Sequence, residues 1–301
     1  MRVATFFQHQ QTLSRIQQST SNLDRVSGQI TSGFKADRFE DQADVSTQLF
    51  NLQELRASNE SFVEGLKVAD SRLRTQEDAL NSMTDLLTEA TRVSTLGRNE
   101  LSPEVRATIA PQAQGLADTF FQLLNTKFEG KFVFSGQGSE TPAISVSLTG
   151  NPDPGDPPPT TYYNGDGEPP QVVTGPGTSQ GYGVTGDNLG FARLKAGLEA
   201  LIFGLENDSE PDLDAAIDFI EQAQKDVSDM LGNIGGEMSG FELLRDRFEA
   251  TNDFMTQRID ELSKVDLAEA STRFAQEENA LNASLSVTSR ILQLSLLNFL
   301  R

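Results

Sequence analysis

The chain has 301 residues, with 44 Asp or Glu against 24 Lys or Arg, so its formal net charge is −20 at pH 7. This acidity disfavours binding to nucleic-acid phosphates and to anionic membrane surfaces, and we expect neither partner. There is no cysteine and only one histidine, His9, so the sequence offers no disulfide, no thiolate or histidine-ligated metal site and no Ser-His-Asp triad. We therefore predict no cofactor and no enzymatic activity.

The amino end lacks the continuous apolar core of a secretory signal peptide, and no stretch approaches 18 uninterrupted apolar residues. The sequence thus predicts neither a cleaved signal peptide nor a transmembrane helix. A protein of this kind that works outside the cell needs an export route that does not read a cleaved signal.

Residues 1–40 carry a weak apolar stripe at the helical period of 3.6 residues. We interpret this segment as an N-terminal polymerisation segment. The residues of the stripe are Leu13, Ile16, Leu23, Val26 and Ile30.

A heptad seam runs from Leu52 to Ala90, where apolar residues recur at alternating steps of three and four. A helix of about 50 residues would be roughly 75 Å long, which exceeds the width of a compact domain of this size. The pattern predicts a mainly α fold, an elongated helical bundle or coiled-coil rod whose N-terminal half covers 41–136. Two seam positions, Asn59 and Gln76, fit either register-setting polar residues or tolerated exceptions.

A further helix is predicted to begin at Ser102-Pro103, with Ser102 as N-cap and Pro103 at the first helical position, and to end near Phe128. Pro111 interrupts this pattern. An interior proline removes a backbone hydrogen bond and destabilises a helix by about 3 kcal/mol, so we expect a kink or a restarted helix there.

Residues 137–190 differ in composition, with nine of the 12 prolines, all three tyrosines and no Lys or Arg. Alternating residues at 144–148 and the run 171–173 predict short strands. We predict a small inserted β domain that projects from the helical shaft and is dispensable for its folding. Residues 174–181 superficially suggest a phosphate loop and 164–168 a calcium loop. Residues 174–181 lack the Lys-Ser/Thr pair of a phosphate loop, so a turn is the favoured interpretation there. The segment that begins at 164 has Gly175 where a calcium loop requires glutamate, so calcium binding is disfavoured.

The second half of the helical body is predicted at 191–265, with helices at 191–205, 213–231 and 241–262 separated at Ser209-Glu210-Pro211 and at Gly235-Gly236. Residues 266–301 form a predicted C-terminal polymerisation helix. Its apolar stripe comprises Leu267, Phe274, Leu281, Leu285, Leu292, Leu296 and Phe299.

Burial of this stripe would yield roughly 10–20 kcal/mol, whereas ordering about 35 residues costs on the order of 50, so the helix needs partners. In one interpretation the two terminal helices complete an intramolecular core. In the other, both ends become ordered only against neighbouring subunits. We predict that the polymerisation interface includes Leu13, Ile16, Leu23, Val26, Ile30, Leu281, Leu285, Leu292, Leu296 and Phe299.

Several segments of the sequence resemble the flagellin-like proteins of the bacterial flagellum, and among them the proteins of the hook-filament junction. The segments also follow one another in the same order as in those proteins. Two departures are 37–44, which replaces a Ser-Asp-Asp-Pro-like stretch, and Pro111. The segments that carry the resemblance are Gln29–Gly33, Asn125, Gly130–Gly136, Pro142, Tyr163–Asp166, Val184–Asp187, Ser263–Ala270 and Leu294–Leu300.

This resemblance implies a structural subunit that joins hook to filament by self-assembly through its terminal helices, with the insert pointing outward. It implies export in an unfolded state through the channel of the flagellum and an extracellular location at the hook-filament junction. The implied partners are further copies of the chain, hook-associated protein 1, flagellin, a cytoplasmic chaperone and the export apparatus. The alternatives are flagellin itself and, remotely, a secreted acidic hydrolase.

Overall fold

The computed structural model describes residues 2–36, 43–99, 102–145 and 157–299, with side chains for all of these except residues 2–6, 8–9, 43–44 and 291–299. The described residues form six helices and two small antiparallel hairpins, which confirms the predicted mainly α class. The chain divides into two compact units. We call 1–58 together with 250–301 the terminal unit, and 59–249 the central unit.

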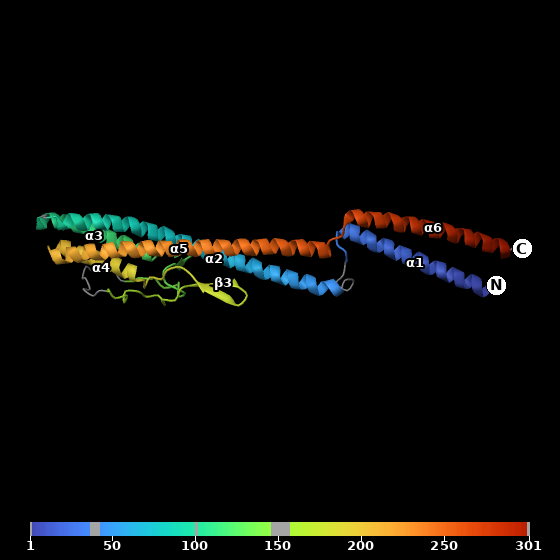
Figure 1. Ribbon diagram of the computed structural model, residues 1–301, viewed down its shortest axis with the longest axis horizontal. Coiled ribbons are helices and arrows are strands. Elements are labelled where there is room, and N and C mark those ends of the chain that lie inside the picture. The colour runs from blue at the N-terminus through green and yellow to red at the C-terminus, as the bar shows by residue number, and fades with distance from the viewer. Residues whose placement is uncertain (1, 37–42, 100–101, 146–156, 300–301) are drawn as a thin grey trace. The chain divides into compact units, whose positions relative to one another are not determined.

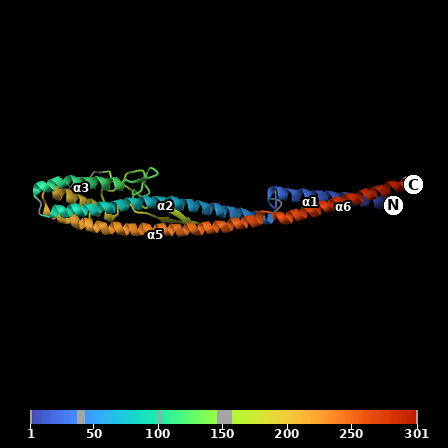
Figure 2. The same cartoon turned by 90° about the horizontal axis from the view of Figure 1, so that it is seen from above.

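The terminal unit pairs the two ends of the chain. Helices α1 (Arg2–Ser32) and α6 (Leu267–Phe299) lie side by side and run antiparallel (Figures 1 and 2). The Asn22 amide nitrogen donates to Glu277 Oε1 at 3.3 Å, which links the two helices. The amino end of α1 therefore lies beside the carboxyl end of α6.

The heptad seam lies on one long helix, α2 (Ala43–Arg98). Its seam residues from 66 onwards are buried in the central unit, because α3 (Pro103–Leu124), α4 (Leu189–Glu206) and α5 (Glu210–Ser263) contribute to the same core. These seam residues are Leu66, Ala69, Leu73, Gln76, Leu80, Met83, Leu87 and Ala90.

Helix α3 begins at Pro103 as predicted but ends at Leu124, four residues before the predicted end. The helix closes there because 127–128 turns into a hairpin strand. Pro111 lies inside one continuous helical segment, so the predicted restart does not occur. Buried neighbours on the same helix, including Ile109 and Phe120, supply packing that offsets the lost backbone hydrogen bond.

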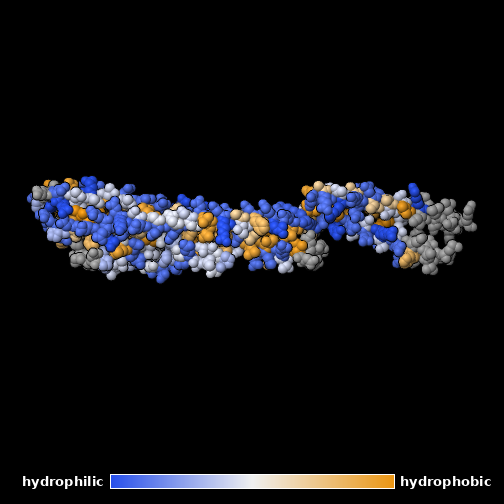
Figure 3. Space-filling view, in the orientation of Figure 1, coloured by the Kyte–Doolittle hydropathy of each residue, from blue (hydrophilic) through white to orange (hydrophobic). Residues whose placement is uncertain are grey.

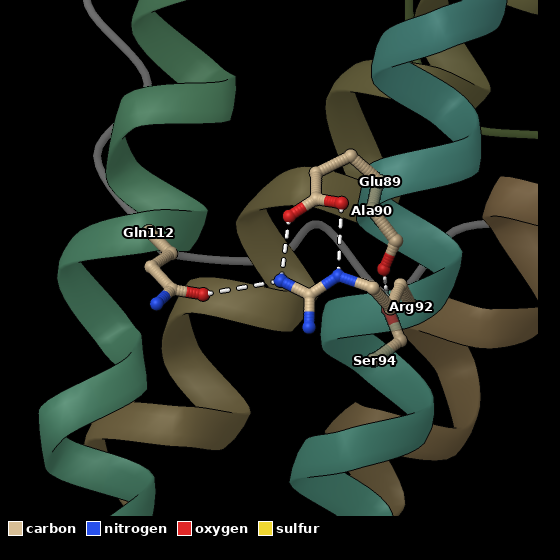
Figure 4. Close-up of polar contacts among 5 residues, drawn as sticks. All are labelled: Glu89, Ala90, Arg92, Ser94 and Gln112. Carbon is tan, nitrogen blue, oxygen red and sulfur yellow. Dashed lines mark hydrogen bonds and ion pairs between the residues drawn. The ribbon is translucent and has the colours of Figure 1, made fainter.

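Polar contacts at the surface link α2 to α3 (Figure 4). Arg92 donates to both carboxylate oxygens of Glu89, at 2.9 and 2.6 Å, and more weakly to Gln112 of α3 at 3.5 Å.

Ser94, which is fully buried, donates its hydroxyl to the Ala90 carbonyl oxygen at 2.7 Å, so this polar core residue is satisfied within its own helix.

Helix α5 continues through Gly235-Gly236, so the predicted break between 231 and 241 is wrong. A glycine costs about 1 kcal/mol in a helix interior relative to alanine. Three large side chains around the pair, Met230, Ile234 and Phe241, are buried in the central core, and their packing outweighs this local preference.

The described residues form one hairpin just before the insert, at 127–132, and one within it, at 171–181. Strand β1 (Lys127–Phe128) pairs with β2 (Lys131–Phe132), and β3 (Gln171–Gly175) pairs with β4 (Thr178–Gly181). The strand predicted at 171–173 is confirmed. Of the strand predicted at 144–148, Ile144 forms a single bridge with Tyr163, and residues 146–148 lie outside the described residues.

The insert does not project from a separate helical core, which corrects the sequence-based prediction. Its apolar side chains belong to the same buried cluster as those of α2, α3, α4 and α5. The hydrophobic pattern of the helices alone could not reveal this, because the insert contributes isolated residues without a period. These residues are Ala143, Ile144, Tyr162, Val172 and Tyr182.

Candidate assembly interface

The connectors at the inner ends of α1 and α6 pair with each other. The Lys35 amide donates to the Ser263 carbonyl at 2.8 Å, and the Val265 amide donates to the Gly33 carbonyl at 3.0 Å. Gly33 has a φ of +78°, a conformation that L-residues with a side chain rarely adopt. This bridge fixes the start of α6 beside the end of α1, and it joins two of the segments that carried the sequence resemblance.

The α1–α6 pair buries few of its own apolar side chains. Of the seven predicted interface residues with described side chains, only Val26 is buried, with 5% exposed, whereas Leu13 is 59% and Leu285 48% exposed. Ile16, Leu23, Ile30 and Leu281 are partly exposed. The remaining three, Leu292, Leu296 and Phe299, lie on α6 but outside the residues with described side chains.

Sequence periodicity missed five exposed apolar residues among those described in the terminal unit, which are Phe7, Phe34, Phe50, Phe254 and Val287. Phe7 falls outside the α1 stripe, Phe34 lies after the end of α1, and Val287 lies two positions from Leu285 on α6. A count of large apolar residues regardless of period would have found them. Orange patches on the visible face of the α1–α6 pair show apolar residues in the open (Figure 3).

The terminal unit is deficient in core. Among residues with described side chains, only four apolar residues in it are buried, compared with 41 in the central unit. Nine of the large apolar side chains described in it are exposed. A unit with so little buried apolar area gains little stability alone, so its exposed side chains favour association with another surface. The buried four are Val26, Leu49, Ile259 and Ala270.

We predict that hydrogen exchange in the isolated chain is fast before about Ile30 and after about Leu281, and slow between Leu66 and Leu87. The terminal helices lack a shared core, whereas the seam is fully packed, so local opening requires much less free energy at the ends. Native-state exchange followed by mass spectrometry measures this. Equal protection in the three segments would support a closed intramolecular core.

In the central unit, Gln76 joins the insert to α2. Its amide nitrogen donates to the carbonyl oxygens of Val133 and Val184, at 2.7 and 2.8 Å, and its Oε1 accepts from the Val184 amide at 3.0 Å. All three hydrogen bonds are made by a residue that is 1% exposed. Gln76 therefore serves neither of the two roles considered from the sequence, because it binds the insert rather than a facing helix.

Helix α5 holds the same turn from the other side. Glu237 Oε2 accepts from the Gly183 amide at 2.7 Å, and the Tyr182 ring packs edge-on against Phe241 with centroids 5.8 Å apart. Gly183 has a φ of +78°, and a Cβ there would lie 2.5 Å from Gln76 Oε1. The turn at 183–184 is thus held by hydrogen bonds from both α2 and α5.

Burial raises the pKa of Glu237, and the hydrogen bond from the Gly183 amide opposes this rise only in part. A carboxyl group whose folded pKa is raised contributes stability below its unfolded pKa, near 4.3, and this stability is lost as the pH rises through the folded pKa. We therefore expect Glu237→Gln, which retains the acceptor, to melt at a higher temperature than wild type at pH 7 but not near pH 4.

Thermal unfolding followed by circular dichroism at both pH values tests this, with exposed Glu242→Gln on the same helix as the control. A Glu237→Gln variant that is less stable than wild type at pH 7 would contradict the prediction.

The acidic turn that resembled a calcium loop has a role within the fold. Asp166 accepts from the amides of Gln137, Gly138 and Glu168 at 2.7 to 3.1 Å. Its carboxylate is thereby engaged by backbone donors, which explains an aspartate here without a metal ion. The other glycine-rich run, 174–181, forms the β3–β4 hairpin with its turn at Gly177, as the preferred interpretation held.

Within the described residues, no group of three or more His, Asp or Glu side chains is arranged to hold a metal ion. His9 lies on α1, outside the residues with described side chains. The described helices also include none with the length and apolarity needed to span a membrane.

Comparison with known proteins decides the family. Residues 3–139 match the bacterial flagellin N-terminal helical region, and residues 217–300 match the bacterial flagellin C-terminal helical region. The chain belongs to the bacterial flagellin family. The two matches leave out most of the insert, so family membership rests on the helical parts of this flagellin-family chain.

Two curated relatives of this flagellin-family chain are flagellar hook-associated proteins 3. The protein of Escherichia coli K12 is 24% identical over 98% of both chains, and that of Salmonella typhimurium LT2 is 24% identical over 50% of this chain and 48% of the relative. These relatives and the family match identify a structural protein of the flagellum.

Solved structures share the fold. A putative flagellar hook-associated protein from Vibrio parahaemolyticus superposes with a TM-score of 0.64 at 19% identity, covering 74% of this chain and all of that chain. Bacillus cereus FlgL superposes with a TM-score of 0.57 at 16% identity, covering 70% of this chain and 99% of that chain.

Proposed function

We propose that this flagellin-family chain joins the flagellar hook to the filament by self-assembly through its terminal helices. The observation that carries the proposal is the exposure of apolar side chains in a terminal unit that buries only four of those described. Apolar surface gains about 25 cal/mol for each Å² removed from water, so contact with the same unit of neighbouring copies supplies the missing core. The proposed interface comprises the residues predicted from the two stripes except Val26, which the single chain already buries.

The similarity to hook-associated protein 3 along almost the whole chain supports a place at the junction rather than in the bulk filament. In that place the chain contacts hook-associated protein 1 on the hook side and flagellin on the filament side. It acts outside the cell after export through the flagellar apparatus without a cleaved signal peptide. A cytoplasmic chaperone covers the apolar stripe of α6 until export.

The chemistry of the central unit supports a structural role over the hydrolase alternative. A cavity of about 770 Å³ between α5 and the insert has one carboxylate, Glu237, among its lining residues. Hydrolysis of a glycosidic bond normally requires two carboxylates on opposite sides of the substrate. The Glu237 carboxylate is moreover engaged by the Gly183 amide.

Electron microscopy of cells that lack this gene tests the proposal. Intact hooks without filaments are the expected result, whereas normal filaments or missing hooks would contradict it. Copy number separates the junction protein from flagellin, because a bulk filament subunit is in great excess over hook protein. The proposal therefore also requires that the chain not exceed hook protein in isolated flagella.

A further inference from the structure

The cavity between α5 and the insert combines an apolar floor with one charged group. Its volume of about 770 Å³ falls in the usual range of ligand sites, about 300–1,000 Å³. Glu237 is the one charged residue among the described residues that line it. On α5, two apolar lining residues precede Glu237 and two follow it, which are Met230, Ile234, Phe241 and Leu244. The cavity therefore places a carboxylate between two apolar pairs.

The Glu237 carboxylate has no cationic partner among the described residues. Its Oε2 accepts from the Gly183 amide, whereas its Oε1 makes no hydrogen bond or ion pair within the part of the chain that the structure describes. Burial raises the pKa of Glu237, because the charged form is partly removed from water and no neighbouring Lys or Arg of the described residues offsets the loss. A cation against Oε1 would supply the missing interaction.

Three glycines open the α5 wall of this cavity. At Gly232, Gly236 and Gly240 an added Cβ would meet no atom within 4 Å, although glycine is among the poorest helix formers. The glycines of α4 differ, since a Cβ at Gly204 would lie 2.8 Å from Leu213, so packing within the chain accounts for it. Among the described residues no such packing accounts for the three α5 glycines, and their bare backbone allows another chain to approach closely.

We propose that the cavity binds a lysine side chain of a different protein, with an apolar residue on each side of that lysine. The stem of the lysine lies on the apolar floor and its ammonium group reaches Glu237 Oε1, since such side chains bury their stems and keep the charged end on a polar group. Lysine is favoured over arginine, because one oxygen suits a compact ammonium, whereas a guanidinium gains most from two and Oε2 is already engaged. This inference concerns the central unit and goes beyond the proposed assembly of the terminal helices.

A second copy of the chain does not supply this lysine. The lysines with an apolar residue on each side in the sequence are Lys35, Lys67 and Lys195. Leu66 and Leu194, which precede two of them, are 1% and 0% exposed in the central core and cannot also line the cavity of another copy. The third ammonium group, that of Lys35, already donates to the Glu261 carbonyl oxygen. The occupant is therefore a segment of another protein, and the net charge of −20 on this chain favours a basic one.

Two blocked tripeptides and the full chain test the proposal, at a concentration where sedimentation shows a monomer. The peptides are acetyl-Leu-Lys-Leu-amide and the same peptide with norleucine in place of lysine, which keeps the stem and lacks the ammonium group. Saturation-transfer NMR measures both dissociation constants. We expect the lysine peptide to bind at least about tenfold more tightly, because only its ammonium group pairs with the carboxylate. Equal binding of the two peptides, or no binding of the lysine peptide, would overturn the proposal.

Two variants locate the peptide in the cavity. Glu237→Gln keeps an acceptor for the Gly183 amide and removes the charge, so both peptides should bind it about equally. Gly236→Leu fills the cavity from a position with open space, so it should bind neither peptide and should melt at or above the wild-type temperature. Glu242→Gln, exposed on the same helix and not among the lining residues, is the matched control and should retain the wild-type preference. Wild-type binding by Glu237→Gln or by Gly236→Leu would contradict the proposed site.

Sedimentation distinguishes a second copy from a different protein as the occupant. If Gly236→Leu abolishes self-association that the wild-type chain shows, a second copy fills the cavity and the proposal is wrong. Leu13→Asp alters the terminal unit alone, so it should bind the lysine peptide as wild type does, and loss of binding there would also overturn the site. A wild-type chain that assembles normally but does not bind the lysine peptide would reject this inference and leave the proposed function intact.

Discussion

Replacing Gln76 with leucine is expected to lower the free energy of unfolding by about 2–6 kcal/mol, because two buried polar groups lose their partner and each costs about 1–3 kcal/mol. The substitution removes all hydrogen bonds from Gln76 to Val133 and Val184 at a site that is 1% exposed. The carbonyl and the amide of Val184 lose their partner, whereas the Val133 carbonyl keeps a hydrogen bond from Arg72 at 3.2 Å. Leucine is close to glutamine in size, so loss of hydrogen bonding rather than a cavity dominates the effect. Urea unfolding followed by circular dichroism measures the change.

Gln112→Leu is the matched control, since it makes the same substitution at an exposed position of α3 whose side chain has only a 3.5 Å contact with Arg92. This variant should remain within about 0.5 kcal/mol of wild type. If the two variants were equally stable, the hydrogen bonds of Gln76 would not hold the insert.

Replacing Leu13 and Leu285 with aspartate is expected to abolish assembly while moving the melting temperature of the monomer only slightly. Both side chains are about half exposed or more in the single chain, so the carboxylates stay in water there. In the proposed interface they would be buried among apolar groups, at several kcal/mol for each unpaired charge. Melting by circular dichroism, sedimentation and attachment of filaments to hooks in complemented cells measure the three effects.

Two controls accompany this experiment. Gln17→Asp adds the same charge at an exposed polar position of α1 and should assemble normally. Val26→Asp places the charge at a site that is 5% exposed and should destabilise the monomer itself. Unfolding of the Leu13/Leu285 double variant would show that these leucines belong to the core of the single chain. Normal assembly by that variant would remove the stripes from the interface.

The parts of the fold that depend on helical periodicity could be predicted from the sequence. Leu66, Leu73, Leu80 and Leu87 recur at seven-residue intervals and are all buried on α2, because a helix presents such positions on one face. The break proposed at Gly235-Gly236 failed for the opposite reason. Glycine disfavours the helix locally, and this preference can be read from the sequence. The packing with distant residues that overrides it leaves no local signal.

The integration of the insert could not be predicted for a related reason. Gln76 and Val184 are 108 positions apart, and neither lies in a pattern that points to the other. The candidate interface was only partly predictable. Periodicity identified Leu13 and Leu285, but it counted Val26 with them, although Val26 is the residue that α1 buries within the single chain.

The hydrogen bonds from α2 and α5 to the turn at 183–184 affect the order of folding. One of its hydrogen bonds closes a loop of 108 residues, and the Glu237 contact must wait for a further 54 residues. Contacts between residues so far apart form late, since the entropy of loop closure is lost before the contacts stabilise the chain. A chain that emerges amino end first therefore cannot complete its central core until Glu237 has also emerged. The central core of a chain that emerges in this direction is therefore completed only after nearly four fifths of its 301 residues are free.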